Sequence, residues 1–158
     1  MNDYRLSKAP KYLKLTLTCF LLVLGLGYLM GLLNIYDKTH LSYAGAIKHI
    51  LGSEEEMIYG KEFGDLVSVS HTHILGWAMM FLSVLIIFAF SNYSGKLKGS
   101  LAVLSFVFIV LDQGAMWLTR YVAAPFAWLF MLAGFVLAAL FCLLVLFNLY
   151  DLWMRKAP

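Results

Sequence analysis

The chain has 158 residues, of which 62% are hydrophobic and 13% are charged, and its formal net charge is +3. Globular domains contain about 45–50% apolar and about 25% charged residues, so a soluble domain of this length could not hide so much apolar surface. The composition therefore excludes an ordinary soluble domain, a disordered chain and a disulfide scaffold. The small basic excess is typical of membrane proteins and does not indicate nucleic-acid binding.

Four long apolar runs predict four transmembrane helices, at residues 13–33, 71–90, 101–119 and 125–148. Each run can cross roughly 30 Å of hydrocarbon as a helix. Strands are excluded because the runs do not alternate polar and apolar residues, and open strands leave backbone groups unpaired in lipid. We therefore expect an all-α, integral membrane four-helix bundle that forms a single membrane domain over residues 1–158.

Two features inside the apolar runs are interpreted as structural. Gly27 and Gly31 form a G-x-x-x-G pattern in the first span, which predicts close packing within the bundle or in an oligomer. Cys19 and Cys142 belong to no C-x-x-C pattern, so we expect two reduced, buried thiols.

The distribution of basic residues predicts the orientation in the membrane. Eight of the 12 Lys and Arg residues fall on the side of the two termini, and four fall on the opposite side. Positive residues collect in the cytoplasm, so both termini are expected there. The long loop at residues 34–70 would then face outward, toward the periplasm if the cell is Gram-negative. These features predict a multi-pass protein of the bacterial inner membrane.

The outer loop contains one segment with a helical pattern. Residues 43–51 place apolar side chains on one face, with Ser42 as a plausible N-cap and Gly52 as a plausible stop. We expect a short amphipathic helix that lies over the outer mouth of the bundle.

All four histidines fall on the predicted outer side. His71 and His73 are two residues apart, so on a regular helix their rings point about 200° apart. The apolar stripes assign His73 to the bundle side and His71 to the lipid side. Gly76, one turn below His73, would leave a flat notch in which a porphyrin could pack. Haem iron accepts a helical imidazole, so His73 is the first candidate ligand of a b-type haem.

A second axial ligand must come from elsewhere in the chain or from another subunit. The candidates are His40 and His49 of the loop, with Met116 of the third span as a further choice. His49 lies on the predicted short helix, and Gly45 one turn earlier would leave room for a flat ligand. For each histidine the alternative is a solvated headgroup-level residue. A frayed helix start would instead let His71 and His73 chelate copper or zinc together.

Asp112 and Arg120 are the two most membrane-buried charges, and both lie in the outer half of the third span. They share a helix face and are separated by roughly 12 Å along the axis. A buried carboxylate is costly in lipid, so Asp112, together with Trp77, is a candidate quinone or proton site. Arg120 could pair with a haem propionate. The structural alternatives are a salt bridge or a helix cap at the membrane edge.

Three short patterns carry a resemblance over residues 36–82. They are Y-D-K-T at residues 36–39, G-S-E-x-E-M at residues 52–57, and a T-H-x-H-L pattern that departs here at Ser70 and Ile74. The segment resembles a group of small, uncharacterised four-span bacterial membrane proteins found among cytochrome-rich respiratory genes. That resemblance implies a redox role.

The expected function is a small membrane subunit that binds b-type haem near the outer face and takes part in respiratory electron transfer. Its partners would be the lipid bilayer, other membrane subunits or a periplasmic cytochrome, with the quinone pool as a possible electron source. One alternative is a cofactor-free accessory subunit of a respiratory complex. A second is a small metal-handling or transport protein. We expect an electron-transfer or accessory subunit rather than a self-contained enzyme.

Overall fold

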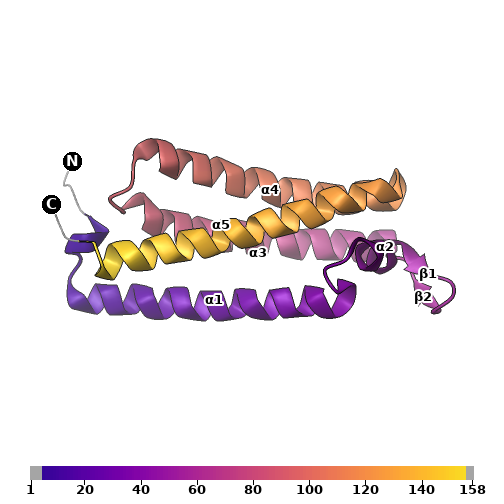
Figure 1. Ribbon diagram of the computed structural model, residues 1–158, viewed down its shortest axis with the longest axis horizontal. Coiled ribbons are helices and arrows are strands. Elements are labelled where there is room, and N and C mark those ends of the chain that lie inside the picture. The colour runs from indigo at the N-terminus through magenta and orange to yellow at the C-terminus, as the bar shows by residue number, and fades with distance from the viewer. Residues whose placement is uncertain (1–4, 156–158) are drawn as a thin grey trace.

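The structure is a computed structural model that describes residues 5–155. The structure has four long helices, a short helix and two short strands. The long helices lie side by side, and the short helix and the strands gather at one end (Figure 1). In chain order the elements are η1 Leu6–Lys8, α1 Lys11–Thr39, α2 Tyr43–Leu51, β1 Gly52–Ser53, β2 Ile58–Tyr59, α3 Phe63–Ala89, α4 Gly95–Tyr121, η2 Ala124–Phe126 and α5 Ala127–Trp153. We call the end that carries the short helix and strands the α2 end.

Four segments are long and apolar enough to span a membrane, which confirms the predicted number of spans. They are Lys11–Thr39, Phe63–Ala89, Gly95–Tyr121 and Ala124–Trp153. Their outward faces carry large exposed apolar side chains, among them Leu22 on α1, Val103 on α4 and Leu146 on α5. Such surfaces suit contact with a lipid bilayer.

The helices are longer than the apolar runs, and the largest difference concerns the second span. It begins at Phe63 rather than at residue 71, so the connection from α1 shrinks to residues 40–62. A capping box forms this start, because Glu62 and Asp65 each accept a hydrogen bond from the other's backbone N–H. The added turns contain apolar residues such as Phe63 and Leu66, but polar residues among them interrupt the apolar run.

The core lies between α3, α4 and α5, whereas α1 packs at the side of the bundle against α2 and α5. Only Leu21 and Thr39 of α1 are buried. Gly27 and Gly31 are exposed, and a Cβ on either would meet no atom within 4 Å. The expectation that these glycines pack within the bundle is therefore wrong, and contact with a partner stays a prediction.

The two cysteines also face outward. Cys19 and Cys142 are free thiols, and both are exposed on the surface of the bundle. The expectation of buried thiols is wrong because lipid is as apolar as the protein core, so an apolar run does not show which face points inward.

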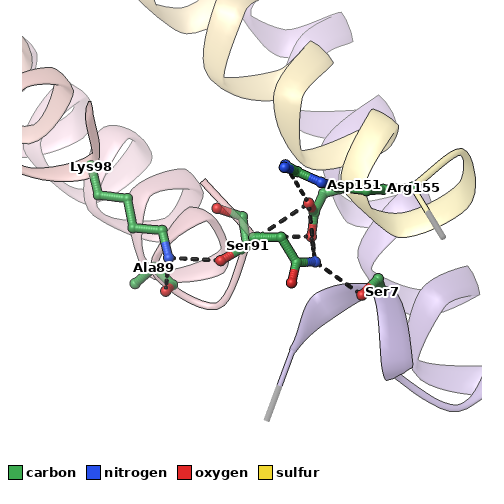
Figure 2. Close-up of polar contacts among 7 residues, drawn as sticks. Ser7, Ala89, Ser91, Lys98, Asp151 and Arg155 are labelled. Carbon is green, nitrogen blue, oxygen red and sulfur yellow. Dashed lines mark hydrogen bonds and ion pairs between the residues drawn. The ribbon is translucent and has the colours of Figure 1, made fainter. Parts of the chain in front are cut away.

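A polar network closes the end of the bundle opposite α2. Asp151 is fully buried and accepts hydrogen bonds from the backbone N–H of Asn92 and from its side-chain amide, both at 3.1 Å. The same amide donates to Ser7 Oγ at 2.9 Å, and Arg155 approaches the Asp151 carboxylate at 3.4 Å. Figure 2 shows Asp151 between Ser7 and Arg155. The network joins η1, the turn between α3 and α4, and the end of α5.

Candidate functional site

The α2 end is assembled around a small apolar cluster. Ile50 of α2, Leu66 of α3 and Met116 of α4 are all buried there against one another. Ser42 starts α2 by accepting a hydrogen bond from the Gly45 N–H at 3.0 Å. The short helix therefore lies at the residues where its pattern was found, and its apolar face packs onto the long helices.

His71 and His73 both lie well inside α3, whose first residue is Phe63. His71 is exposed and His73 is half-buried, as expected for rings on different faces of a regular helix. The idea that a frayed helix start lets both rings bind one metal is therefore wrong, because the helix starts two turns earlier.

His73 is held by its own helix. Its Nδ1 lies 2.9 Å from the carbonyl oxygen of Val69, and its ring meets Trp77 edge-on at 5.4 Å between centroids. A carbonyl only accepts hydrogen bonds, so this contact places the proton on Nδ1 and leaves the lone pair on Nε2. Metal-binding imidazoles are commonly oriented by such a bond. A Cβ on Gly76 would meet nothing within 4 Å, so open space lies beside the following turn.

His49 is half-buried on α2 rather than solvated in a loop. Burial and, to a smaller extent, the charges of Lys61 and Lys38 together lower the pKa of its imidazole to about 4. His49 is consequently neutral at pH 7. Its side chain lines a pocket of about 450 Å³ between the end of α1, α2 and the start of α3.

His40 has a structural position. It is the C-cap of α1 in the left-handed conformation, with φ 48°, and its N–H donates to the Tyr36 carbonyl at 2.7 Å. The ring is exposed and meets Tyr36 edge-on. His40 therefore helps to reverse the chain between α1 and α2.

The structure does not bring His49 and His73 to one iron. The pocket around His49 reaches Asp65 of α3, and His73 follows Asp65 by about 12 Å along the helix axis. Two imidazoles on one metal ion each lie at about 2 Å from it. The expected room beside Gly45 is also filled, because a Cβ there would overlap the Thr39 carbonyl oxygen. Among residues 5–155, no group of three or more His, Cys, Asp and Glu side chains could hold a metal ion.

Asp112 is buried between α4 and α5, with 2% of its surface exposed. Its carboxylate accepts a hydrogen bond from Gln113 Nε2 at 2.7 Å, and Gly134 of α5 lies next to it. Within the described residues it forms no ion pair, so the structural alternative of a salt bridge is wrong for Asp112. A lone carboxylate at this depth is a functional candidate.

Arg120 ends α4 beside the loop that follows β2. A Cβ on Gly60 would lie only 2.9 Å from Arg120 Nη1, and the buried Nε has no hydrogen-bond partner in the part of the chain that is described. The structure thus places Arg120 at the α2 end, while Trp77 sits deeper and contacts His73.

Two features of this end were not found from the sequence. Trp117 Nε1 donates to Ser70 Oγ at 2.8 Å, which joins α4 to α3. Lys38 and Lys61 line one pocket with His49, although they belong to different ends of the loop. No local pattern in the sequence pairs these two lysines.

Comparison with known proteins places the chain in a family. The profile of a family described as a transmembrane helical domain matches residues 40–158. No curated protein matches the chain, and no solved structure does. Together with the four apolar helices, the match shows that this multi-pass membrane protein belongs to the transmembrane helical domain family.

Proposed function

We propose that this protein is a subunit of a respiratory electron-transfer complex in the bacterial inner membrane and supplies His73 as one axial ligand of a b-type haem. One observation carries the proposal, namely the hydrogen bond from His73 Nδ1 to the Val69 carbonyl. That bond leaves Nε2 as the nitrogen that binds iron. Within residues 5–155 the His71 ring makes no such hydrogen bond, and it is exposed.

The surroundings of His73 fit a flat group. Trp77 lies against the ring on one side, and open space adjoins Gly76. Haem, when bound, supplies reversible one-electron chemistry, and an imidazole from a helix is a common ligand. Because His40 and His49 are held at the α2 end, the second ligand in this proposal comes from another membrane subunit, a periplasmic cytochrome or a second copy of the chain.

Asp112 is the proposed contact for a quinone headgroup or a transferred proton. Its carboxylate has one described hydrogen-bond partner, Gln113, and the Gln113 Oε1 atom is buried without a partner in the described residues. Unpaired polar atoms in a buried site are costly, which favours a further polar group near them. Arg120 is the proposed partner of a haem propionate, since its Nε is also unpaired there.

The proposed orientation puts both termini in the cytoplasm. Eight of the 12 Lys and Arg residues belong to the end opposite α2 or to the adjoining tails. The α2 end, with His49, then faces outward, where a periplasmic cytochrome could reach it.

Absorption spectra of the purified protein test the proposal. We expect a Soret band and a reduced-minus-oxidised α band in the wild type and in His71→Ala, and loss of both bands in His73→Ala. His71→Ala is a matched control because it removes a neighbouring imidazole from the exposed face of the same helix. A wild-type protein without any haem, purified with its native partners, would overturn the proposal.

A cofactor-free accessory subunit is the second candidate. It is favoured because His40, His49 and His71 each lie apart from His73 in the structure. Copurification with a large respiratory complex, without haem assigned to this chain, would support it. The metal-handling alternative has no matching observation, since His71 and His73 occupy different faces of α3.

A further inference from the structure

A pocket at the α2 end has no part in the proposed haem site. It has a volume of about 450 Å³ and lies where α1 ends, α2 ends and α3 begins. We call it the lysine pocket, and its lining consists of Lys38, Lys48, His49, Ile58, Tyr59, Gly60, Lys61, Glu62 and Asp65. Pockets of about 300–1,000 Å³ are typical of small-ligand sites.

The acidic side chains of the lysine pocket already have other partners. Glu62 and Asp65 form the capping box of α3, so their carboxylates accept backbone N–H groups at the start of that helix. Lys48 is paired with Glu56 of the turn between the two strands. The basic side chains that remain for a ligand are Lys38 and Lys61.

The ammonium groups of Lys38 and Lys61 form no hydrogen bond or ion pair within residues 5–155. Burial lowers the pKa of Lys61, the nearby charge of Lys38 lowers it further, and Asp65 acts in the opposite direction. The two lysines also act on His49. Like charges that face one pocket repel each other, and an anion between them removes that repulsion.

Aromatic side chains mark the depth of the lysine pocket in the membrane. Tyr36 of α1, Tyr121 of α4 and Trp128 of α5 are exposed near the α2 end of their helices. Tyr and Trp collect at the level of the lipid headgroups. The pocket therefore lies where the phosphate groups of lipids are found.

We propose that the lysine pocket binds a phosphate group through Lys38 and Lys61, with His49 as a hydrogen-bond donor. Lysine binds phosphate as a compact point charge, and two lysines match the charge of a phosphate better than that of a single carboxylate. The phosphate comes from an anionic lipid headgroup or from free phosphate in solution. The proposal is independent of haem.

Ligand titrations of the full-length, delipidated protein in a neutral detergent test this site. Dihexanoyl phosphatidylglycerol and inorganic phosphate are the two probes, with sodium chloride at equal ionic strength as the baseline. Phosphorus NMR line broadening and the shift in melting temperature give the apparent Kd. Binding of the lipid alone identifies a headgroup site, and binding of both probes identifies a site that also takes free phosphate. Either result supports the proposal.

The pocket variant is a double variant that carries both Lys38→Gln and Lys61→Gln. Its matched control is a second double variant that carries Lys11→Gln and Lys96→Gln. The control removes two exposed lysines from the opposite end of the bundle. We expect binding to weaken at least about tenfold in the pocket variant, because each charged hydrogen bond contributes strongly, and to stay unchanged in the control. Lys38→Arg with Lys61→Arg keeps the charge and should keep binding, which separates loss of the site from loss of folding. Absence of binding to the wild type, or equal weakening in the control, would overturn the proposal.

Discussion

The Asp151 carboxylate at the end of α5 accepts hydrogen bonds from both the backbone N–H and the side-chain amide of Asn92, which lies 59 residues earlier. The carboxylate is fully buried, and the Asn92 side-chain amide also donates a hydrogen bond to Ser7 Oγ of η1. The Asn92 side chain thus joins η1 and the end of α5 to its own turn between α3 and α4. The network sits at the end of the bundle opposite α2, beside the buried core residues Leu6 and Leu152.

Replacement of Asp151 by Ala should destabilise the protein by about 2–4 kcal/mol, because it leaves the Asn92 amide groups and Arg155 without their acceptor. Thermal or denaturant unfolding in detergent measures the effect. Asp151→Asn keeps an acceptor oxygen and should cost less. Asp37→Ala removes an exposed carboxylate from α1 and should change stability by less than about 0.5 kcal/mol. Equal losses for Asp151→Ala and Asp37→Ala would contradict the importance of the network.

Gly45→Ala should destabilise the junction between α1 and α2. A Cβ at Gly45 would overlap the backbone carbonyl of Thr39, so α2 would have to shift. We expect a loss of at least about 1–3 kcal/mol, as for other overpacked sites. Gly99→Ala is the control, because nothing lies within 4 Å of its Cβ position in α4. It should be neutral or stabilising by up to about 1 kcal/mol. A Gly45→Ala protein as stable as wild type would show that α2 does not pack as described.

Acid should destabilise the α2 end through His49. Its folded-state pKa of about 4 lies below the ordinary value of 6.5, so the unfolded chain binds the proton first. The stabilising contribution is complete above pH 6.5 and decreases as the pH falls from 6.5 toward 4. Melting temperatures recorded across this range should decline in the wild type and decline less in His49→Gln. The size of the difference is reduced because His49 is only half-buried.

A control for the acid effect is Lys96→Gln, which changes an exposed charge at the other end of the bundle. Its melting profile should run parallel to that of the wild type. If His49→Gln and the wild type showed the same slope between pH 6.5 and pH 4, the lowered pKa of His49 would be refuted.

Ser70→Ala should cost about 1 kcal/mol, because Trp117 Nε1 loses its only described acceptor. Ser70 is buried at the contact of α3 with α4. Thr72→Ala, two residues away on the exposed face, removes a hydroxyl that bonds only within α3 and serves as the control. Unfolding of the two variants side by side measures the difference, and a larger loss for Thr72→Ala would contradict the assignment.

Hydropathy predicted the number of spans but not where the second one begins. Residues 63–70 are helical and contain Phe63, Leu66 and two valines, but Gly64 and Asp65 interrupt the apolar run. The useful signal was Glu62 followed by Asp65 at capping-box spacing, with carboxylates in both positions. Without the capping box, the apolar pattern places His71 and His73 at a helix end rather than in a helix interior.

Helix periodicity predicted which face of α3 is buried, and His73 is indeed more buried than His71. The G-x-x-x-G pattern and the usual burial of free cysteine gave wrong expectations for Gly27 and Cys142, which face outward. In water the apolar face of a helix must point inward, whereas in lipid both faces can be apolar. The placing of Lys38 and Lys61 in one pocket depends on how the loop closes and leaves no local pattern in the sequence.

The four crossings return the chain to the end of the bundle where it begins, so η1 and the end of α5 lie together (Figure 1). An even number of crossings has a consequence for reporter design. Complementary fragments of a split fluorescent protein, fused to the two ends, would share one aqueous compartment in either membrane orientation. A chain cut in the turn after Tyr121 would carry the second fragment to the opposite compartment, and fluorescence would be lost.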